Sequence, residues 1–402
     1  MSVVKLSLAW MRTSLFWTKT WILKPPISKG NAATKPSLAA LKRSSFMITC
    51  LLCLVLVFAF LYIYRKVNQR LYRAELAEDL VFDLGPRAYR QAVQVRGQDR
   101  TKPLILWVHG GPGLPNPALT YSYQKALEDD FIICYWTQAG SGRSYYLNPD
   151  RYQEGPSYQE LEASLDDLVD KLCQRYGKER LILVGHSFGS ILGLGYAKAH
   201  PGKLLAYVGI SQITDMIAGN FLILDMAEGV INRLGDRQAL ASLTKAKRAT
   251  RHALQSRYIE AKNYLKVERL AQDYLRTIPW KAQAKVVWQV LSSPDLSWAD
   301  LRWYGLMACQ GTRFTQIQAD LMEEAQRMDL SAIDRLEVPL LLVSGSLDWQ
   351  APLDQVFDFF DQVQAPQKAF RIIPGAGHSP FLSHKKLFSQ CLKDYLYYHL
   401  KD

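Results

Sequence analysis

The segment Leu181-Ile-Leu-Val-Gly-His-Ser-Phe-Gly189 decides the fold, because it predicts a buried strand that turns sharply into a helix. The helical run begins at Ser190. In so tight a turn, Gly185 and Gly189 remove side chains that would clash, and Ser187 is presented at a helix N-terminus. The helix dipole and the free N–H groups there favour negative charge. A chance glycine-rich turn is the alternative; the strand before it and the helix after it favour a nucleophilic serine.

Two apolar runs near the C-terminus end in loops that carry the partners such a serine needs. The run 340–344 leads to Asp348, and the run 370–373 leads to His378. A serine hydroxyl requires a base, and that base requires an orienting acid. Loops just past the strands are where α/β sheets bind ligands. The chain order Ser187, Asp348, His378 therefore predicts a catalytic triad in which the imidazole moves the proton and the carboxylate holds the imidazole.

The loop His109-Gly-Gly-Pro-Gly113 follows directly after the strand-like run 103–108. Such a loop can aim a backbone N–H at the oxygen that gains charge during acyl transfer. We assign this oxyanion role to the N–H of Gly111, with the N–H of Phe188 as the second donor. His186 is expected to be a packing or hydrogen-bonding neighbour. The other residues of the loop are expected to support its shape: His109, Gly110, Pro112 and Gly113.

Beyond these motifs, strand-like runs alternate with helical patterns from about residue 88, which predicts an α/β sheet. Ser157 and Glu160 form a capping box for a helix that Gly177 ends. The strand rhythm breaks between about 212 and 332, which predicts a helical cap inserted into the sheet domain. The predicted strands cover residues 88–95, 103–109, 131–136, 181–184, 204–210, 339–344 and 369–373.

The net charge of +12 suggests a nucleic-acid or membrane partner until its location is considered. Residues 1–45 carry eight cations and residues 65–73 carry four, with no acidic residue in either segment. These twelve cations equal the whole net charge, so the formal charges of residues 74–402 cancel. We therefore expect no nucleic-acid partner. No metal-binding or phosphate-binding motif occurs either, so we expect no cofactor and no metal.

Between the two basic segments, residues 46–64 contain no charged residue. As a helix they would be about 28 Å long, close to the thickness of a bilayer's hydrocarbon core. A buried core helix would keep a polar face, and a cleaved signal would be followed by a small-residue cleavage site. We therefore predict a single-pass anchor with the lipid bilayer as partner. The larger number of cations before the span predicts a cytoplasmic N-terminus and a catalytic body on the far side.

These features predict an α/β chain in six parts. They are a basic N-terminal segment (1–45), a transmembrane anchor (46–64), a linker (65–84), the first part of the core (85–211), a helical cap (212–332) and the second part of the core (333–402).

The motifs resemble those of the α/β-hydrolase superfamily, and within it the proline iminopeptidase-like serine peptidases. His109–Gly113 matches the HGGPG loop of that group. Residues 137–144 resemble its D-Q-R-G-x-G-x-S segment, with matches at Gln138, Gly140, Gly142, Arg143 and Ser144. The resemblance covers about residues 85–400. It implies an α/β-hydrolase sheet with an inserted helical cap, and cleavage of a small peptide or amide substrate through an acyl-enzyme.

Some positions depart from that group. Thr137 and Ala139 stand where the group has Asp and Arg, and Gly-His-Ser-Phe-Gly is the elbow of many esterases and lipases. The peptidases bind the substrate's amino group through cap glutamates, and no motif assigns that role among Glu228, Glu260, Glu268, Glu323 and Glu324.

Three functional hypotheses follow from these motifs and departures. A membrane-anchored aminopeptidase of the proline iminopeptidase type leads. A carboxylesterase or acyl-ester hydrolase with the same triad is the alternative. A catalytically silent hydrolase fold used as a binding module is the third, and the intact triad argues against it.

Overall fold

The computed structural model describes residues 38–151, 155–275, 280–308 and 312–399. It contains two compact units, Met1–Phe58 and Ala59–Asp402. Helix α2 (Leu38–Leu71) contributes to both units. Its segment Ser45–Leu71 is long and apolar enough to cross a membrane. Residues 1–37 of the predicted basic segment lie outside the described residues.

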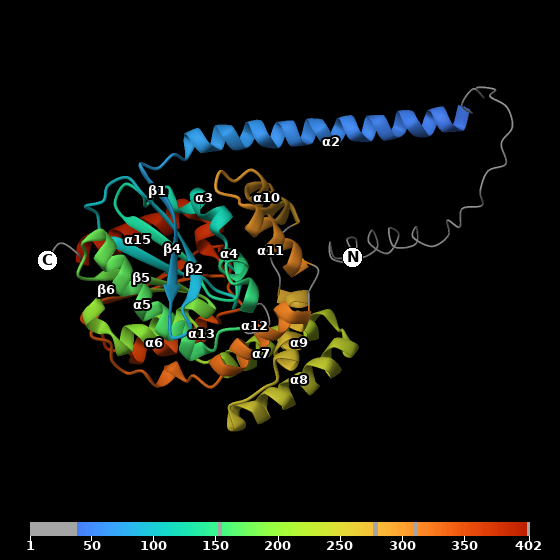
Figure 1. The fold of residues 1–402 in the computed structure, drawn as a ribbon. Helices are drawn as coiled ribbons and strands as arrows, with labels where there is room; N and C mark the ends of the chain where they lie inside the picture. Colours follow the sequence, from blue (N-terminus) through green and yellow to red (C-terminus); the bar gives the residue numbers. More distant parts are fainter. Residues whose placement is uncertain (1–37, 152–154, 276–279, 309–311, 400–402) are drawn as a thin grey trace. The chain divides into compact units, whose positions relative to one another are not determined.

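The core of the second unit is an eight-stranded sheet with the order β1-β2-β4-β3-β5-β6-β7-β8 (Figure 1). Strands β1 and β2 form an antiparallel hairpin and β2 pairs antiparallel with β4, whereas the pairs from β4 to β8 are parallel. All seven predicted apolar runs form strands, β2 to β8. The strands are β1 Leu76–Leu84, β2 Tyr89–Gly97, β3 Leu104–Val108, β4 Ile132–Thr137, β5 Leu181–His186, β6 Leu204–Ile210, β7 Leu340–Gly345 and β8 Lys368–Ile373.

The predicted linker 65–84 holds the end of α2 and the whole of strand β1. This strand has acidic residues on its exposed positions, and for that reason its sequence resembles a polar connection. Leu76 and Leu84 are buried at its two ends, and Glu78 accepts hydrogen bonds from Arg175 and Tyr176. Pairing with β2 therefore makes this segment part of the sheet.

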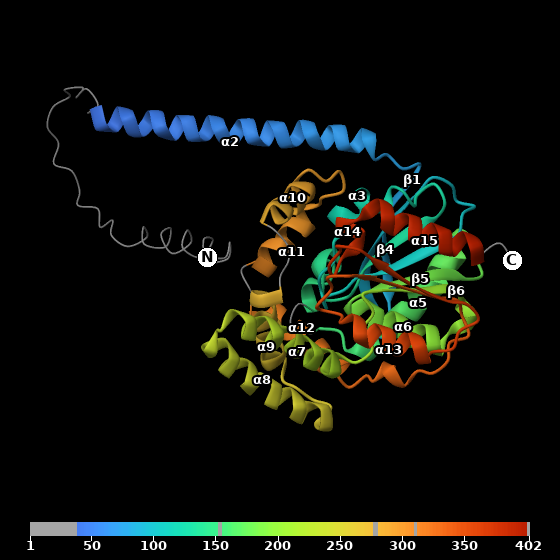
Figure 2. The same cartoon turned by 180° about the vertical axis from the view of Figure 1, so that it is seen from behind.

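Apolar residues alternate across the sheet and build a separate core on each face. In β3, Leu104, Leu106 and Val108 belong to one cluster, while Ile105 and Trp107 belong to the other. Figures 1 and 2 show the two covering layers from opposite sides. The first face is covered by α5 (Tyr158–Tyr176), α6 (Phe188–Ala199) and α13 (Leu353–Gln362), and the second by α3 (Thr120–Gln124), α14 (Pro380–Ser383) and α15 (Lys385–His399).

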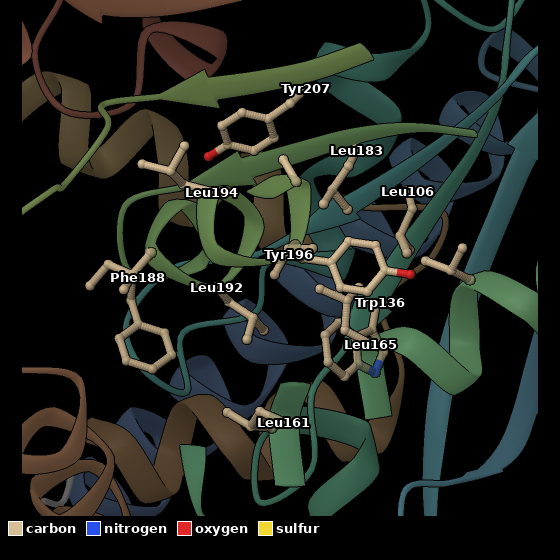
Figure 3. Packing of buried hydrophobic residues seen from close by; sticks show 14 of the residues in the cluster. Leu106, Trp136, Leu161, Leu165, Leu183, Phe188, Leu192, Leu194, Tyr196 and Tyr207 are labelled. Carbon is tan, nitrogen blue, oxygen red and sulfur yellow. The ribbon is translucent and has the colours of Figure 1, made fainter. Parts of the chain in front are cut away.

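Helices α5 and α6 fix the strand-to-helix turn that carries Ser187. The predicted capping box is confirmed: the Ser157 hydroxyl accepts from the Glu160 N–H, and the Glu160 carboxylate accepts from the Ser157 N–H. Gly177 ends α5, as predicted, and its backbone is left-handed. Figure 3 shows Leu192 and other side chains of α6 packed among residues of α5 and the strands. This packing holds the start of α6 rigidly over the sheet.

In the described residues, six α-helices lie between β6 and β7, in the segment predicted as a cap. Their own small core includes Leu224, Ile231, Leu243 and Val267. Helices α7, α8 and α9 contact one another, whereas α10 contacts η2 and α11 contacts α4 of the core. The six are α7 Met216–Leu234, α8 Arg237–Ser256, α9 Ala261–Leu275, α10 Trp280–Leu291, α11 Trp298–Ala308 and α12 Thr312–Ala325. The remaining short helices are α4 Gly142–Tyr146, η2 Pro117–Leu119, η3 Pro149–Arg151, η4 Pro201–Lys203 and η5 Leu330–Ala332.

Candidate active site

Ser187 occupies a strained turn between β5 and α6. Its backbone has φ +55° and ψ −125°, a conformation that non-glycine residues rarely adopt. A Cβ on Gly185 would lie 2.6 Å from the Gly189 carbonyl oxygen, and a Cβ on Gly189 would lie 2.4 Å from the Val108 carbonyl oxygen. Both positions therefore require glycine. The packing of the turn against β3 compensates for the strain and leaves the Ser187 hydroxyl at the sheet's edge.

A continuous chain of hydrogen bonds joins the three residues predicted as a triad. The Ser187 Oγ–His378 Nε2 distance is 2.8 Å. On the other side of the ring, His378 Nδ1 lies 2.9 Å from Asp348 Oδ1 and 3.1 Å from Oδ2. The structure thus brings together residues that are far apart in the sequence, at the carboxyl ends of β5, β7 and β8. The geometry is that of a hydroxyl, a base and an orienting acid.

The Asp348 carboxylate is buried and fixed by its own loop. Its Oδ1 accepts from the backbone N–H groups of Gln350 (3.0 Å) and Ala351 (3.1 Å). Burial acts to raise its pKa, but His378 and the hydrogen bonds to the carboxylate outweigh burial and lower the pKa below 3.8. The group is therefore ionised at neutral pH, when it can stabilise a charged imidazole. A Cβ on Gly345 would lie 2.3 Å from two carbonyl oxygens of the His378 loop, so glycine lets the two loops approach.

Two residues outside the predicted triad hold the backbone of His378. The His186 Nε2–H donates to the His378 carbonyl oxygen (2.9 Å), and the Ser211 Oγ–H donates to the same oxygen (2.9 Å). His186 was expected to be a hydrogen-bonding neighbour. Ser211 was not foreseen; its positive φ of 50° at the end of β6 has no signal in the sequence. Burial, together with His378, lowers the pKa of His186 to about 3, so its ring is neutral.

The predicted oxyanion loop lies directly against the nucleophile. A Cβ on Gly110 would lie 2.8 Å from the Cβ of Ser187, so only glycine permits this approach. Gly111 has φ +129°. His109 braces the loop: its Nδ1–H donates to the Gly110 carbonyl oxygen (2.8 Å), and its Nε2 accepts from the N–H of Gln138 (3.2 Å). Burial lowers the pKa of His109 to about 4, which keeps the ring neutral and suited to this bracing role.

The predicted second donor, the N–H of Phe188, belongs to the first residue of α6. The first N–H groups of a helix have no partner within the helix, so this one is available to a developing negative charge. The Phe188 side chain is buried in the core and fixes the start of the helix (Figure 3).

Cap residues that the sequence did not single out hold the far side of the oxyanion loop. Gln318 of α12 donates its Nε2–H to the Pro112 carbonyl oxygen (2.5 Å). The Trp303 indole N–H of α11 donates to the Gly113 carbonyl oxygen (3.3 Å). The two predicted loop residues Pro112 and Gly113 are thus tied to the cap, and the cap contributes to the position of the loop.

The segment that resembles the D-Q-R-G-x-G-x-S motif makes structural contacts. Arg143 forms a bidentate ion pair with Asp300 of the cap, with an Nη2–Oδ2 distance of 2.9 Å. Arg143 also pairs with Asp79 of β1. This motif therefore joins the core, the cap and the first strand. Ala139, at a position of departure from the family, is buried, and its N–H donates to Gln91.

A pocket of about 340 Å³ opens beside Asp348. Its walls are apolar residues of the cap, Met226 and Leu275, and residues of the loop after β7, including Leu347 and Trp349. The pocket places a mostly apolar surface next to the triad. Among the described residues, no cluster of three or more His, Cys, Asp and Glu side chains is arranged to hold a metal ion.

Four of the candidate cap glutamates have partners within the protein. Glu228 forms an ion pair with Lys247 (2.5 Å), and Glu324 accepts from the backbone N–H of Tyr158 (2.5 Å) at the start of α5. Glu323 accepts from the hydroxyl of Tyr258. Glu260 is exposed and accepts from the side-chain amide of Asn263 (3.5 Å). The Glu268 side chain lies outside the described residues.

Comparisons with known proteins agree with the fold. The family model described as "alpha/beta hydrolase fold" matches residues 103–385. The curated "Probable aminopeptidase YbaC" of Bacillus subtilis is 24% identical over 324 residues, which cover 77% of this chain and 94% of that protein. The "Proline iminopeptidase" of Xylella fastidiosa (strain Temecula1) is 25% identical over 309 residues, which cover 71% of this chain and 86% of that protein.

Among solved structures, a bacterial membrane phospholipase A superposes with a TM-score of 0.53 at 16% identity. The match covers 90% of this chain and all of that chain. At this identity the similarity describes the fold alone.

Proposed function

Because this chain belongs to the α/β-hydrolase fold family, we propose that it is a serine hydrolase in which Ser187, His378 and Asp348 form the catalytic triad. The observation that carries the proposal is the hydrogen-bonded chain from the Ser187 hydroxyl through His378 to the buried Asp348 carboxylate. We further propose that residues 46–64 anchor the enzyme in a membrane, on the basis of the apolar helix.

In the first half of the reaction, His378 Nε2 takes the proton of the Ser187 hydroxyl as Oγ attacks the substrate carbonyl carbon. The N–H groups of Gly111 and Phe188 donate to the oxyanion that forms. The tetrahedral intermediate collapses, the bond to the leaving group breaks, and His378 returns the proton to that group. An acyl-enzyme on Ser187 remains.

In the second half, His378 takes a proton from water, whose oxygen attacks the acyl carbon. Collapse releases the acid and restores the Ser187 hydroxyl with the proton from His378. Asp348 stays ionised throughout and stabilises the imidazolium in both halves.

The leading substrate class is a small peptide or amide from which an N-terminal residue is released. The aminopeptidase and proline iminopeptidase relatives, which match most of this chain at low identity, support that class.

An acyl-ester hydrolase is the second candidate, and a specific observation favours it. The peptidases recognise an amino group through cap glutamates, but here Glu228 is neutralised by Lys247 and Glu324 caps helix α5. The pocket beside Asp348 is lined mainly by apolar residues, which suits an acyl chain better than an ammonium group.

The test uses the full chain in detergent micelles, offered a prolyl arylamide and a series of acyl esters, with Ser187→Ala as the control. Release of the arylamine by the wild type alone supports the aminopeptidase. Turnover of the esters without release of the arylamine supports the second candidate and excludes the first. No turnover together with no labelling by a serine-directed phosphonate contradicts both, and leaves the silent binding module.

The proposed orientation has a separate test. A reporter that functions only outside the cytoplasm is fused after Asp402, and we expect this reporter to be active. Activity of a reporter that functions only in the cytoplasm would overturn the orientation.

A further inference from the structure

The end of helix α2 is bonded to one half of the cap. The ring centroids of Phe60 and Tyr64 lie 5.8 Å and 5.3 Å from that of Trp288 in α10. Asn68 is buried, and its Nδ2–H donates to the Ser292 carbonyl oxygen (2.8 Å). These contacts fix α10 against the last turns of the apolar span and the residues that follow it.

The first charged side chain after the span makes the closest of these contacts. The Arg65 guanidinium donates to the carbonyl oxygen of Leu296 (2.6 Å), in the turn between α10 and α11. Arginine is excluded from the hydrocarbon core and marks its boundary with the headgroups. Since Arg65 is bonded to this turn, the turn lies at the depth of the membrane–water boundary whenever the span is inserted.

Large apolar side chains are exposed on this same part of the cap. Trp298, at the start of α11, is 80% exposed, and on α10 Val287 is 58% and Leu291 40% exposed. At 100° per residue, Val287 and Leu291 share an arc of about 100° with Trp288, which contacts α2. The exposed apolar stripe is therefore continuous with the side of α10 that faces the membrane helix.

The charge of α10 suits an anionic lipid surface. The helix sequence contains two lysines and no acidic residue, and Lys285 is exposed. Tryptophan is enriched at membrane interfaces, where its apolar ring and polar N–H meet two environments.

We propose that Val287, Leu291 and Trp298, called here the interfacial face, lie in the headgroup region of the bilayer as a second membrane contact. The inference rests on the proposed anchoring by residues 46–64. A lipid surface is the occupant that the position of Arg65 favours. The interfacial face shares α11 with Trp303, which bonds the oxyanion loop, so the half of the cap that touches lipid also reaches the active site.

An environment-sensitive fluorophore on the full chain tests the proposal. Cys50, Cys53, Cys309 and Cys391 are replaced by serine, which leaves the buried Cys134 and Cys173 as the remaining cysteines of the sequence. The label is attached through Trp298→Cys, or through Leu234→Cys as the matched control. Leu234 is 68% exposed at the end of α7, in the other half of the cap. Each protein is reconstituted into vesicles of phosphatidylcholine and phosphatidylglycerol, with or without lipid that carries a nitroxide near its headgroup.

We expect both proteins to float with the vesicles and the label at position 298 to be quenched by the nitroxide lipid at least about twofold more than the label at 234. Equal quenching at the two positions, with both proteins floating, overturns the interfacial face and leaves the anchor intact. A blue-shifted label at 298 that the lipid does not quench means that protein covers the face, and overturns the proposal. Failure to float overturns the anchoring and this inference with it, while the hydrolase assay in micelles is unaffected.

Discussion

At the scale of the residue, the site depends on contacts that tolerate little change. Ser187 keeps an unfavourable backbone conformation because the glycines around it let β3, β5 and α6 meet. His378 is held at Nδ1 by Asp348 and at its carbonyl oxygen by His186 and Ser211. The ring is therefore oriented before any substrate binds, which lowers the cost of reaching the reactive geometry.

Replacement of Asp348 by Asn separates the role of the carboxylate from that of the fold. The amide can still fill the space, but it favours the wrong imidazole tautomer, so kcat is expected to fall by about 10⁴-fold. Steady-state kinetics on the substrate that the wild type cleaves measures the effect, and Ser187→Ala provides the background rate. A kcat within tenfold of the wild type would mean that Asp348 does not orient the base.

The buried His186 makes stability depend on pH in a defined window. Its pKa is about 3 in the folded state, below the usual 6.5, so between these values the unfolded chain binds more protons. Stability therefore falls as the pH drops below 6.5, by about 2 kcal/mol at pH 5 from this residue. Asp348 contributes little to the change between pH 7.5 and pH 5, since a lowered carboxylate pKa costs stability only as the pH approaches and falls below 3.8.

Denaturant midpoints at pH 7.5 and pH 5 test this dependence. His186→Gln keeps an N–H donor for the His378 carbonyl oxygen but has no proton to gain. The variant is expected to lose less stability on acidification than the wild type. Equal losses in the two proteins would contradict the prediction.

At the scale of the element, patterns within one helix or strand were predictable and contacts between distant elements were not. The capping box and the stop at Gly177 use neighbouring residues, so the sequence of α5 contains the whole signal. Strand β1 was not predicted, because its buried positions, Leu76 and Leu84, become part of the core only when the strand pairs with β2. The contacts of Ser211 and Gln318 join residues more than 160 positions apart, which no local pattern encodes.

The contact between α12 and the oxyanion loop makes Gln318 a positioning residue. Gln318→Leu removes the donor to the Pro112 carbonyl oxygen and is expected to lower kcat about tenfold with little change in KM, because a small displacement of an oxyanion donor is costly. Gln316→Leu is the matched control, since Gln316 lies on the same helix and its side-chain amide donates to the exposed Asp320 of that helix. A higher KM with an unchanged kcat would argue against a positioning role. So would equal effects of Gln318→Leu and Gln316→Leu.

At the scale of the whole molecule, the first strand of the sheet lies before the residues that the family model matches. Strand β1 lies before residue 85, and it buries Leu76 and Leu84 while Arg143 joins its Asp79 to the cap. The family model matches from residue 103, so the hairpin of β1 and β2 lies before the matched segment.

Truncation tests the contribution of this strand. A chain that begins at Ala74 keeps β1, whereas a chain that begins at Gly85 loses it. Two buried leucines contribute about 3–6 kcal/mol, so the shorter chain is expected to unfold about 10 °C or more below the longer one. Thermal unfolding followed by circular dichroism measures the difference. Coincident transitions would show that β1 adds no stability.

The bonds of Arg65 also bear on which membrane suits the chain. A free arginine at the end of a span extends toward water when the bilayer is too thick or too thin, and so absorbs a difference in length. Here the guanidinium is engaged by main-chain carbonyls of the cap, so this end of the anchor has little freedom to adjust. If residues 46–64 span a bilayer as proposed, a difference between bilayer thickness and span length must be absorbed by the lipids or by tilting of the apolar helix. We then expect the protein to concentrate in bilayers whose thickness matches its span.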